Sequence, residues 1–263
     1  MTSTPPTLVV AGMHRSGTSM TAGVLGQCGL FLGDRLIPAD RYNVTGYHED
    51  LDFLQLGMRM ARACCDEREP GHHDWGITAS GRIDRTPLDS LRAQAVRLVD
   101  ARREGARPWG FKDPRASLFL DFWHSVMPEA RFVLVFRAPW DVVASASRIE
   151  DGPFRDEPGL AASAWRLYNR ELVAFARRSR ERCVVLAASA FVDAPDAVAS
   201  CLATRLGHVL PGLDPDSPEL PRAVDRSLLS TARRRDPVIA LTRRLLPDAD
   251  ELFGELNELA DVA

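Results

Sequence analysis

A glycine-bounded loop near the start of the chain has the residue types that bind phosphate. Apolar residues 8–11 are followed by the pattern Gly12-x-x-x-x-Gly17-Thr18-Ser19 and then by a helix-like segment. Such a loop binds phosphate through backbone N–H groups at a helix N-terminus. A nucleoside triphosphatase carries a lysine at the position of Thr18, where it reaches the β- and γ-phosphates. The pattern therefore predicts a phosphate site that is not built for a β/γ-phosphate pair.

The second cluster surrounds the only lysine of the chain. Lys112 stands in the segment 110–115, Gly-Phe-Lys-Asp-Pro-Arg, and every other basic residue among the 33 is arginine. One explanation for the single lysine is a composition biased towards arginine. The segment by itself is also consistent with an ordinary Asp-Pro turn. A site that needs a compact point charge, however, resists replacement by the wide guanidinium fork. We therefore predict a functional Lys112 at the carboxyl end of a strand, the edge where open α/β sheets bind ligands.

The third cluster follows a continuous apolar run at residues 131–136. Arg137 comes directly after the run, Asp141 lies at the start of a helix, and Ser145 lies one turn further inside it. The Ser145 hydroxyl and Arg137 could share an anion, with arginine supplying charge and serine a neutral donor. The alternative is structural, with Asp141 as an acid at a helix N-terminus and Arg137 on the surface.

Hydrophobic patterning places these clusters at the ends of strands. It predicts strands at residues 8–12, 109–111, 131–136 and 183–186. It predicts helices at residues 18–29, 48–65, 86–104, 117–125, 141–149, 159–181, 193–206, 237–245 and 248–260. Residues 30–47 and 66–80 are predicted to be irregular. Strands that alternate with helices indicate an α/β protein with a central parallel β-sheet flanked by helices on both faces.

The whole chain, residues 1–263, is predicted to be a single domain. The helices of about 48–108 form an insertion, and about 211–263 form a helical C-terminal extension. Within that extension the arginine run at 233–235 is interpreted as a solvated helix face rather than as a phosphate site.

Composition excludes several classes of protein. A net charge of −3 argues against a general nucleic-acid binder. No apolar run reaches the ~18 residues of a membrane span, and the N-terminus lacks the basic flank of a signal peptide. The five cysteines have neither zinc nor redox spacing, so we expect reduced thiols and a cytoplasmic location. His72 and His73 have no partner at zinc spacing, so a structural loop is preferred and no metal site is predicted.

In this order and spacing, the three clusters resemble sulfotransferases that use 3′-phosphoadenosine 5′-phosphosulfate, over about residues 8–200. The pattern is similar to bacterial relatives of the tyrosylprotein and glycosaminoglycan enzymes. The resemblance implies a P-loop NTPase-like three-layer sandwich. In this resemblance the glycine-bounded loop of the chain matches the family's 5′-phosphosulfate loop, with Arg15 in place of the common lysine. The pair of Arg137 and Ser145 matches the family's 3′-phosphate site. The residues that it implies for donor binding are Arg15, Ser16, Gly17, Thr18, Ser19, Met20, Arg137 and Ser145.

The implied reaction passes a sulfuryl group to an acceptor hydroxyl, in preference to an amine, by in-line displacement, and releases adenosine 3′,5′-bisphosphate. Arg15 and Lys112 are the candidates to stabilise charge on the bridging oxygen, and no metal is implied. Cytosolic relatives place a histidine base two residues after the lysine, where this chain has Pro114. Residues 43–50 resemble the segment from which other relatives supply a glutamate. Glu49 is therefore the first candidate for the base and His48 the second. The alternative is that Glu49 and the acids after it have only a structural role at a helix N-terminus, where acidic residues are favoured.

Two departures leave adenine binding poorly specified. Met20 stands where many relatives stack a tryptophan, and residues 187–191 replace a Tyr-Glu-Asp-Leu segment. The expected acceptor is a small hydroxylated metabolite or glycoside of secondary metabolism, with no nucleic-acid or membrane partner; the oligomeric state is not predicted. A P-loop kinase or nucleotide-binding protein and a non-catalytic relative remain as alternatives.

Overall fold

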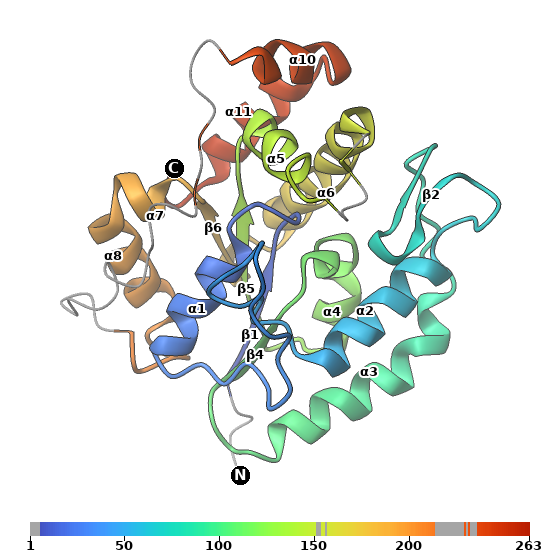
Figure 1. Ribbon diagram of the computed structural model, residues 1–263. Coiled ribbons are helices and arrows are strands. Elements are labelled where there is room, and N and C mark those ends of the chain that lie inside the picture. Colours follow the sequence, from blue (N-terminus) through green and yellow to red (C-terminus); the bar gives the residue numbers. More distant parts are fainter. Residues whose placement is uncertain (1–5, 151–153, 156, 214–228, 230, 232–235) are drawn as a thin grey trace.

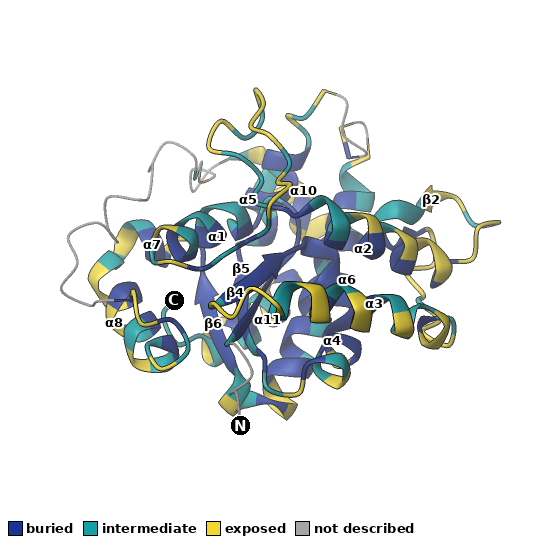
Figure 2. Cartoon of the chain, turned by 90° about the horizontal axis from the view of Figure 1, so that it is seen from below, coloured by how far each residue is buried: buried dark blue, intermediate teal, exposed yellow. Residues whose placement is uncertain are grey.

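The centre of the molecule is a four-stranded parallel sheet in the order β4-β1-β5-β6. The computed structural model describes residues 6–150, 154–155, 157–213, 229, 231 and 236–263. The strands are β1 (Thr7–Ala11), β4 (Trp109–Lys112), β5 (Arg131–Phe136) and β6 (Cys183–Ala187). Nearly all of their residues are buried (Figure 2), as expected for parallel strands that are covered on both faces.

The strand order brings the three predicted clusters to one edge of the sheet. β1 pairs with β4 on one side, where Val10 lies opposite Lys112, and with β5 on the other, where Ala11 lies opposite Leu134. Because all these strands are parallel, their carboxyl ends meet at the same edge. The chain order also reverses at β1, which creates the crevice where open α/β sheets bind ligands.

Helices cover both faces of the sheet, which confirms the predicted fold class. Figure 1 shows α1, α7 and α8 on one side of the strands and α4 and α6 on the other. The bounds are α1 (Thr18–Gln27), α4 (Leu120–Val126), α6 (Pro158–Arg178), α7 (Ala190–Asp193) and α8 (Pro195–Leu206). The arrangement is a three-layer α/β sandwich.

Between β1 and β4 the chain forms α2 (Leu51–Ala63) and α3 (Leu88–Arg103). The helix expected at 48–65 begins only at Leu51. His48 has a φ of 56°, outside the right-handed helical region, and the Asp50 side chain caps the helix by accepting the Asp52 N–H at 2.8 Å.

Residues 66–80 were expected to be irregular but contain a small antiparallel hairpin. It consists of β2 (Gly71–His72), the 3₁₀ turn η1 (His73–Trp75) and β3 (Ile77–Thr78). Two-residue strands are too short to give a periodic pattern in the sequence.

Two further helices differ from the sequence expectation at their starts. The 3₁₀ helix η2 (Pro114–Phe119) precedes α4, with Asp113 as its cap. Helix α5 (Pro139–Ala146) begins two residues earlier than expected, because Pro139 has the fixed φ that suits the first position of a helix.

The C-terminal segment returns to the sheet. Helices α10 (Pro237–Leu245) and α11 (Ala249–Leu259) pack against α5 and α6, and Val262 then forms a parallel bridge with Leu186 of β6. The arginine run at 233–235 lies outside the described residues. Among the described residues, no helix has both the length and the apolar character needed to cross a membrane.

Candidate active site

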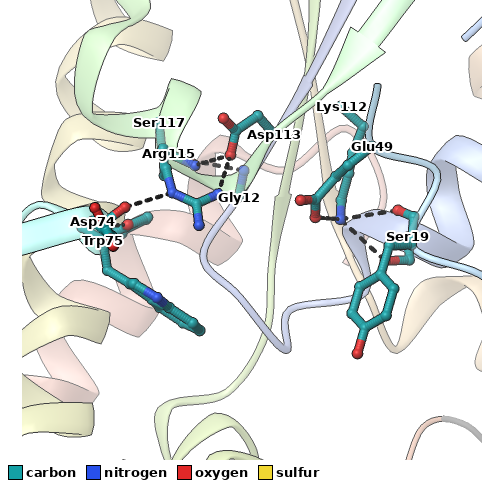
Figure 3. Close-up of polar contacts among 11 residues, drawn as sticks. Gly12, Ser19, Glu49, Asp74, Trp75, Lys112, Asp113, Arg115 and Ser117 are labelled. Atoms are coloured by element: carbon teal, nitrogen blue, oxygen red, sulfur yellow. Dashed lines mark hydrogen bonds and ion pairs between the residues drawn. The ribbon is translucent and has the colours of Figure 1, made fainter. Parts of the chain in front are cut away.

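Two glycines shape the loop between β1 and α1. A Cβ on Gly12 would lie 2.2 Å from the carbonyl oxygen of Val135, so no side chain fits there. Gly17 has a φ of 89°, in the left-handed region that glycine adopts without cost. The Gly12 N–H donates to the Ser117 Oγ at 2.8 Å, which joins the loop to η2 (Figure 3). The loop is therefore held against both β5 and η2.

The start of α1 offers backbone N–H groups to an anion. The first N–H groups of any helix lack intrahelical acceptors, and within the described structure no side chain caps α1. The N–H groups of Thr18, Ser19 and Met20 are in this position. Ser16 differs, because its N–H already donates to the Met13 carbonyl at 3.1 Å and its hydroxyl is buried with no partner among the described residues.

The Lys112 ammonium joins the loop to the segment that precedes α2 (Figure 3). Its Nζ lies 2.5 Å from Glu49 Oε1. It also donates to Ser19 Oγ and to the Tyr47 carbonyl, each at 3.1 Å. These acceptors use all three N–H donors of an ammonium. Lys112 is only 2% exposed, so the charge is held in place within the protein.

The structure separates the two candidates for the base. Glu49 is buried beside Lys112 and lines the larger cavity of the site. His48 instead lines a groove along α1, where a Cβ on Gly23 would lie 3.1 Å from the His48 Nε2. Burial, and then the charge of Lys112, lower the pKa of His48.

Arg15, Arg137 and Ser145 form a second polar cluster. The Arg15 Nε donates to Ser145 Oγ at 3.0 Å, and the Arg137 Nη1 donates to the Arg15 carbonyl at 3.1 Å. Arg137 also lies 3.8 Å from Asp141. Burial lowers the pKa of both arginines. At Arg137 the charge of Asp141 opposes this shift, whereas the charges of Arg15 and Arg148 add to it. Two partly desolvated guanidinium groups at close range would be stabilised by an anion.

Two cavities meet at this site. The larger, of about 550 Å³, is lined by Glu49 and Lys112, and the smaller, of about 100 Å³, by Met20 and Arg137. Both are lined by Arg15, Thr18, Ser19, Tyr42 and Asn43. The junction therefore lies at the start of α1, next to the Lys112 ammonium.

Sequence reasoning missed the aromatic wall of the larger cavity. The His14 ring lies against Trp75 with ring centroids 3.7 Å apart and a tilt of 51°, and Trp75 meets Phe154 edge-on at 5.2 Å. Trp75 belongs to the hairpin segment that was interpreted as a structural loop. His14 could have been noticed as a titratable residue inside the phosphate loop. The remote pairing of Trp75 and Phe154 leaves no signal in the sequence.

Comparisons with known proteins show which family the chain belongs to. The profile of the sulfotransferase family matches residues 6–211. This chain therefore belongs to the sulfotransferase family, which confirms the resemblance found in the three sequence clusters.

Individual relatives are distant. Nodulation protein NoeE of Sinorhizobium fredii (strain NBRC 101917 / NGR234) is 29% identical over 150 residues, which are 56% of this chain and 32% of NoeE. The match thus spans about a third of that relative.

Two solved structures share the fold. One is the sulfotransferase domain of the Synechococcus PCC 7002 olefin synthase, with 19% identity, a TM-score of 0.50 and coverage of 94% of this chain and 92% of that one. The other is sulfotransferase STF9 from Mycobacterium avium, with 15% identity, a TM-score of 0.54 and coverage of 99% and 78%.

Proposed function

We propose that this protein transfers a sulfuryl group from 3′-phosphoadenosine 5′-phosphosulfate to a hydroxyl, in preference to an amine, of a small-molecule acceptor. The observation that carries the proposal is the position of Lys112. Its ammonium contacts Glu49 and Ser19 at the point where the two cavities share a wall. Membership of the sulfotransferase family supports sulfuryl transfer as the reaction.

The smaller cavity is the proposed donor side. The N–H groups at the start of α1 would hold the 5′-phosphate, as helix N-termini hold phosphates generally. Arg137 and Ser145 would hold the 3′-phosphate, and Arg15 lies between these two places because it contacts both residues of that pair. Met20 lines the same cavity and is the candidate neighbour of the adenine.

The larger cavity is the proposed acceptor side. An acceptor oxygen would attack sulfur and form the new S–O bond, while the S–O bond to the 5′-phosphate breaks. The hydroxyl proton would pass to the Glu49 carboxylate, and the bond electrons would leave on the bridging oxygen of the bisphosphate. Lys112 and Arg15 would stabilise that charge from fixed positions, which is how preorganised groups accelerate group transfer.

Because Glu49 and not His48 lines the larger cavity, we propose Glu49 as the base. The insertion at 48–108 carries α2 and the 71–78 hairpin, whose residues line the same cavity. We therefore propose that this insertion sets acceptor choice, on a single domain. The cytoplasmic location and the absence of a metal stay predictions from the sequence.

The donor assignment is tested by calorimetric titration with adenosine 3′,5′-bisphosphate and, separately, with ATP. We expect saturable bisphosphate binding that weakens strongly in Arg137→Ala. Tight ATP binding without bisphosphate binding would instead identify a kinase or another nucleotide-binding protein. Bisphosphate binding without any transfer would identify a non-catalytic relative.

The catalytic assignments are tested by transfer of radiolabelled sulfate. Lys112→Ala and Arg137→Ala should each lose at least about 100-fold in rate, the scale of removing one preorganised electrostatic group. Turnover at the wild-type rate in either variant would refute that role.

The base is tested by a matched pair of variants. Glu49→Gln keeps a hydrogen-bond acceptor for Lys112 but accepts no proton, so we expect kcat to fall by about 100-fold or more. His48→Asn should remain within a few-fold of wild type. The reverse pattern would assign the base to His48.

A further inference from the structure

Lys112 and Arg115, two of the cations that line the larger cavity, are already paired with carboxylates within the protein, and the third, Arg15, lies at the proposed donor side. Lys112 pairs with Glu49. The Arg115 Nη1 lies 3.0 Å from Asp113 Oδ1, and its Nε donates to the Asp74 carbonyl at 2.6 Å. A charged acceptor would lose its hydration in this cavity without gaining an unused opposite charge from these groups, and such a transfer is costly.

Tyr47 and Asp40 also line this cavity, and their polar groups are hydrogen-bonded within the protein. The Tyr47 hydroxyl donates to Asp40 Oδ2 at 2.8 Å, and Asp40 Oδ1 accepts the N–H groups of Tyr42 and Asn43. Burial and this hydrogen bond raise the pKa of Tyr47 to about 12. The phenol therefore stays neutral at physiological pH, and it too brings no charge to the cavity.

The rest of the lining is apolar and only partly covered. Leu54 and Met58 lie one turn apart on α2, so they share a helix face, and both line the cavity while remaining half-buried. Trp75 faces the same space beside Phe154. Figure 3 shows Trp75 and the Lys112–Glu49 pair on opposite sides of the close-up. Trp75 and both members of the Lys112–Glu49 pair line the same cavity.

From this distribution we infer that the acceptor is an uncharged phenol or alcohol with an apolar body. Its hydroxyl would lie at Glu49, and its body would cover Leu54, Met58 and Trp75. Binding would then bury apolar surface that the unliganded protein leaves accessible, which is the main source of affinity in small-molecule pockets. The cavity of about 550 Å³ suits a molecule of this kind. The inference rests on the proposed sulfuryl transfer and narrows it to one class of acceptor.

A matched pair of acceptors tests this inference. 4-Propylphenol and 3-(4-hydroxyphenyl)propionate share the phenol and the chain length and differ by a carboxylate, while methyl β-glucoside is a neutral polar alcohol. With labelled donor we expect kcat/KM for 4-propylphenol to exceed that for each of the other two by at least about tenfold, the scale of a few apolar contacts in a pocket.

Variants of α2 and of the hairpin test the proposed wall. Trp75→Ala should raise the KM for 4-propylphenol by about tenfold or more and leave the affinity for adenosine 3′,5′-bisphosphate unchanged. Met58→Lys should narrow or reverse the preference between the two phenols, because it places an unpaired cation on the wall. Gln55→Ala, on the exposed side of α2, is the control. It should change neither the KM for 4-propylphenol nor the preference between the two phenols.

The outcomes separate this inference from the proposed function. Bisphosphate binding with preferred transfer to the carboxylate or to the glucoside would overturn the inference and leave sulfuryl transfer standing. Bisphosphate binding without saturable binding of 4-propylphenol would also overturn it. Failure of bisphosphate binding itself would overturn the proposed function, and with it the basis for the acceptor class.

Discussion

The surroundings of His14 disfavour the protonated form of its imidazole in the folded state. Its ring lies near those of Trp75 and Tyr168, with centroid distances of 3.7 and 6.0 Å. Its Nε2 is buried with no hydrogen-bond partner among the described residues. Burial lowers the pKa of His14 well below its usual value, and the charges of Arg115, Lys112 and Arg15 lower it further. The folded protein therefore keeps this imidazole neutral.

This neutral imidazole predicts a loss of stability in mild acid. In the unfolded chain His14 protonates near pH 6.5, whereas in the folded protein its lowered pKa keeps it neutral. The unfolded state then binds more protons, so the free energy of unfolding falls as pH falls below about 6.5. Urea unfolding at pH 6.5 and 5.5 should show about 1 kcal/mol more loss in wild type than in His14→Gln. Equal losses in the two proteins would contradict a neutral buried His14.

At the scale of elements, the strands and the loop at the sheet edge could be predicted from local sequence. The continuous apolar residues at 131–136 indicate a buried strand, and the glycine spacing indicates the loop. The clusters around Arg15, Lys112 and Arg137 lie at one edge of the sheet, as expected. The Lys112–Glu49 ion pair was not predicted, although both residues were candidates. It joins positions 63 residues apart, and such pairing depends on tertiary packing that no local pattern encodes.

The position of Glu49 depends on the residue that follows it. Asp50 caps α2, and its other carboxylate oxygen accepts from the Arg102 Nη2 at 2.8 Å and from the Nε at 3.2 Å. The Asp50 side chain is fully buried and that of Arg102 is 14% exposed. One carboxylate thus starts α2 and ties it to α3, and this contact fixes the chain next to the proposed base.

Removal of this carboxylate should therefore destabilise the fold. Asp50→Ala loses a helix cap and leaves Arg102 with Asp52 as its remaining acidic partner, so we expect a loss of about 2–4 kcal/mol in the free energy of unfolding. Asp52→Ala is the control, because Asp52 is more exposed and should cost about 1 kcal/mol or less. Urea unfolding measures both losses. Similar losses in the two variants would show that Asp50 has no special role.

At the scale of the whole molecule, the C-terminal segment closes the far edge of the sheet. The Asp261 N–H donates to the Val185 carbonyl, and the Val262 carbonyl accepts from Ala187 N–H. An uncovered edge strand leaves unpaired backbone groups and invites association with other chains. Residues beyond 211 were expected as a helical extension, but their last few residues also bond to β6. The pairing partner lies about 75 residues earlier, so the sequence alone gives no sign of it.

Asp261 is the residue on which this closure depends. Its carboxylate lies 2.8 Å from the Arg180 Nη2 and 3.3 Å from the Arg205 Nη1, and it also accepts the Val185 N–H at 2.8 Å. Because its side chain is only 10% exposed, Asp261→Ala should lower the free energy of unfolding by about 2–4 kcal/mol. Asp250→Ala removes the exposed ion pair with Arg243 and should cost about 1 kcal/mol or less. Urea unfolding gives both values, and hydrogen exchange should show faster exchange in β6 for Asp261→Ala alone. Unchanged protection of β6 would mean that the closure does not depend on this carboxylate.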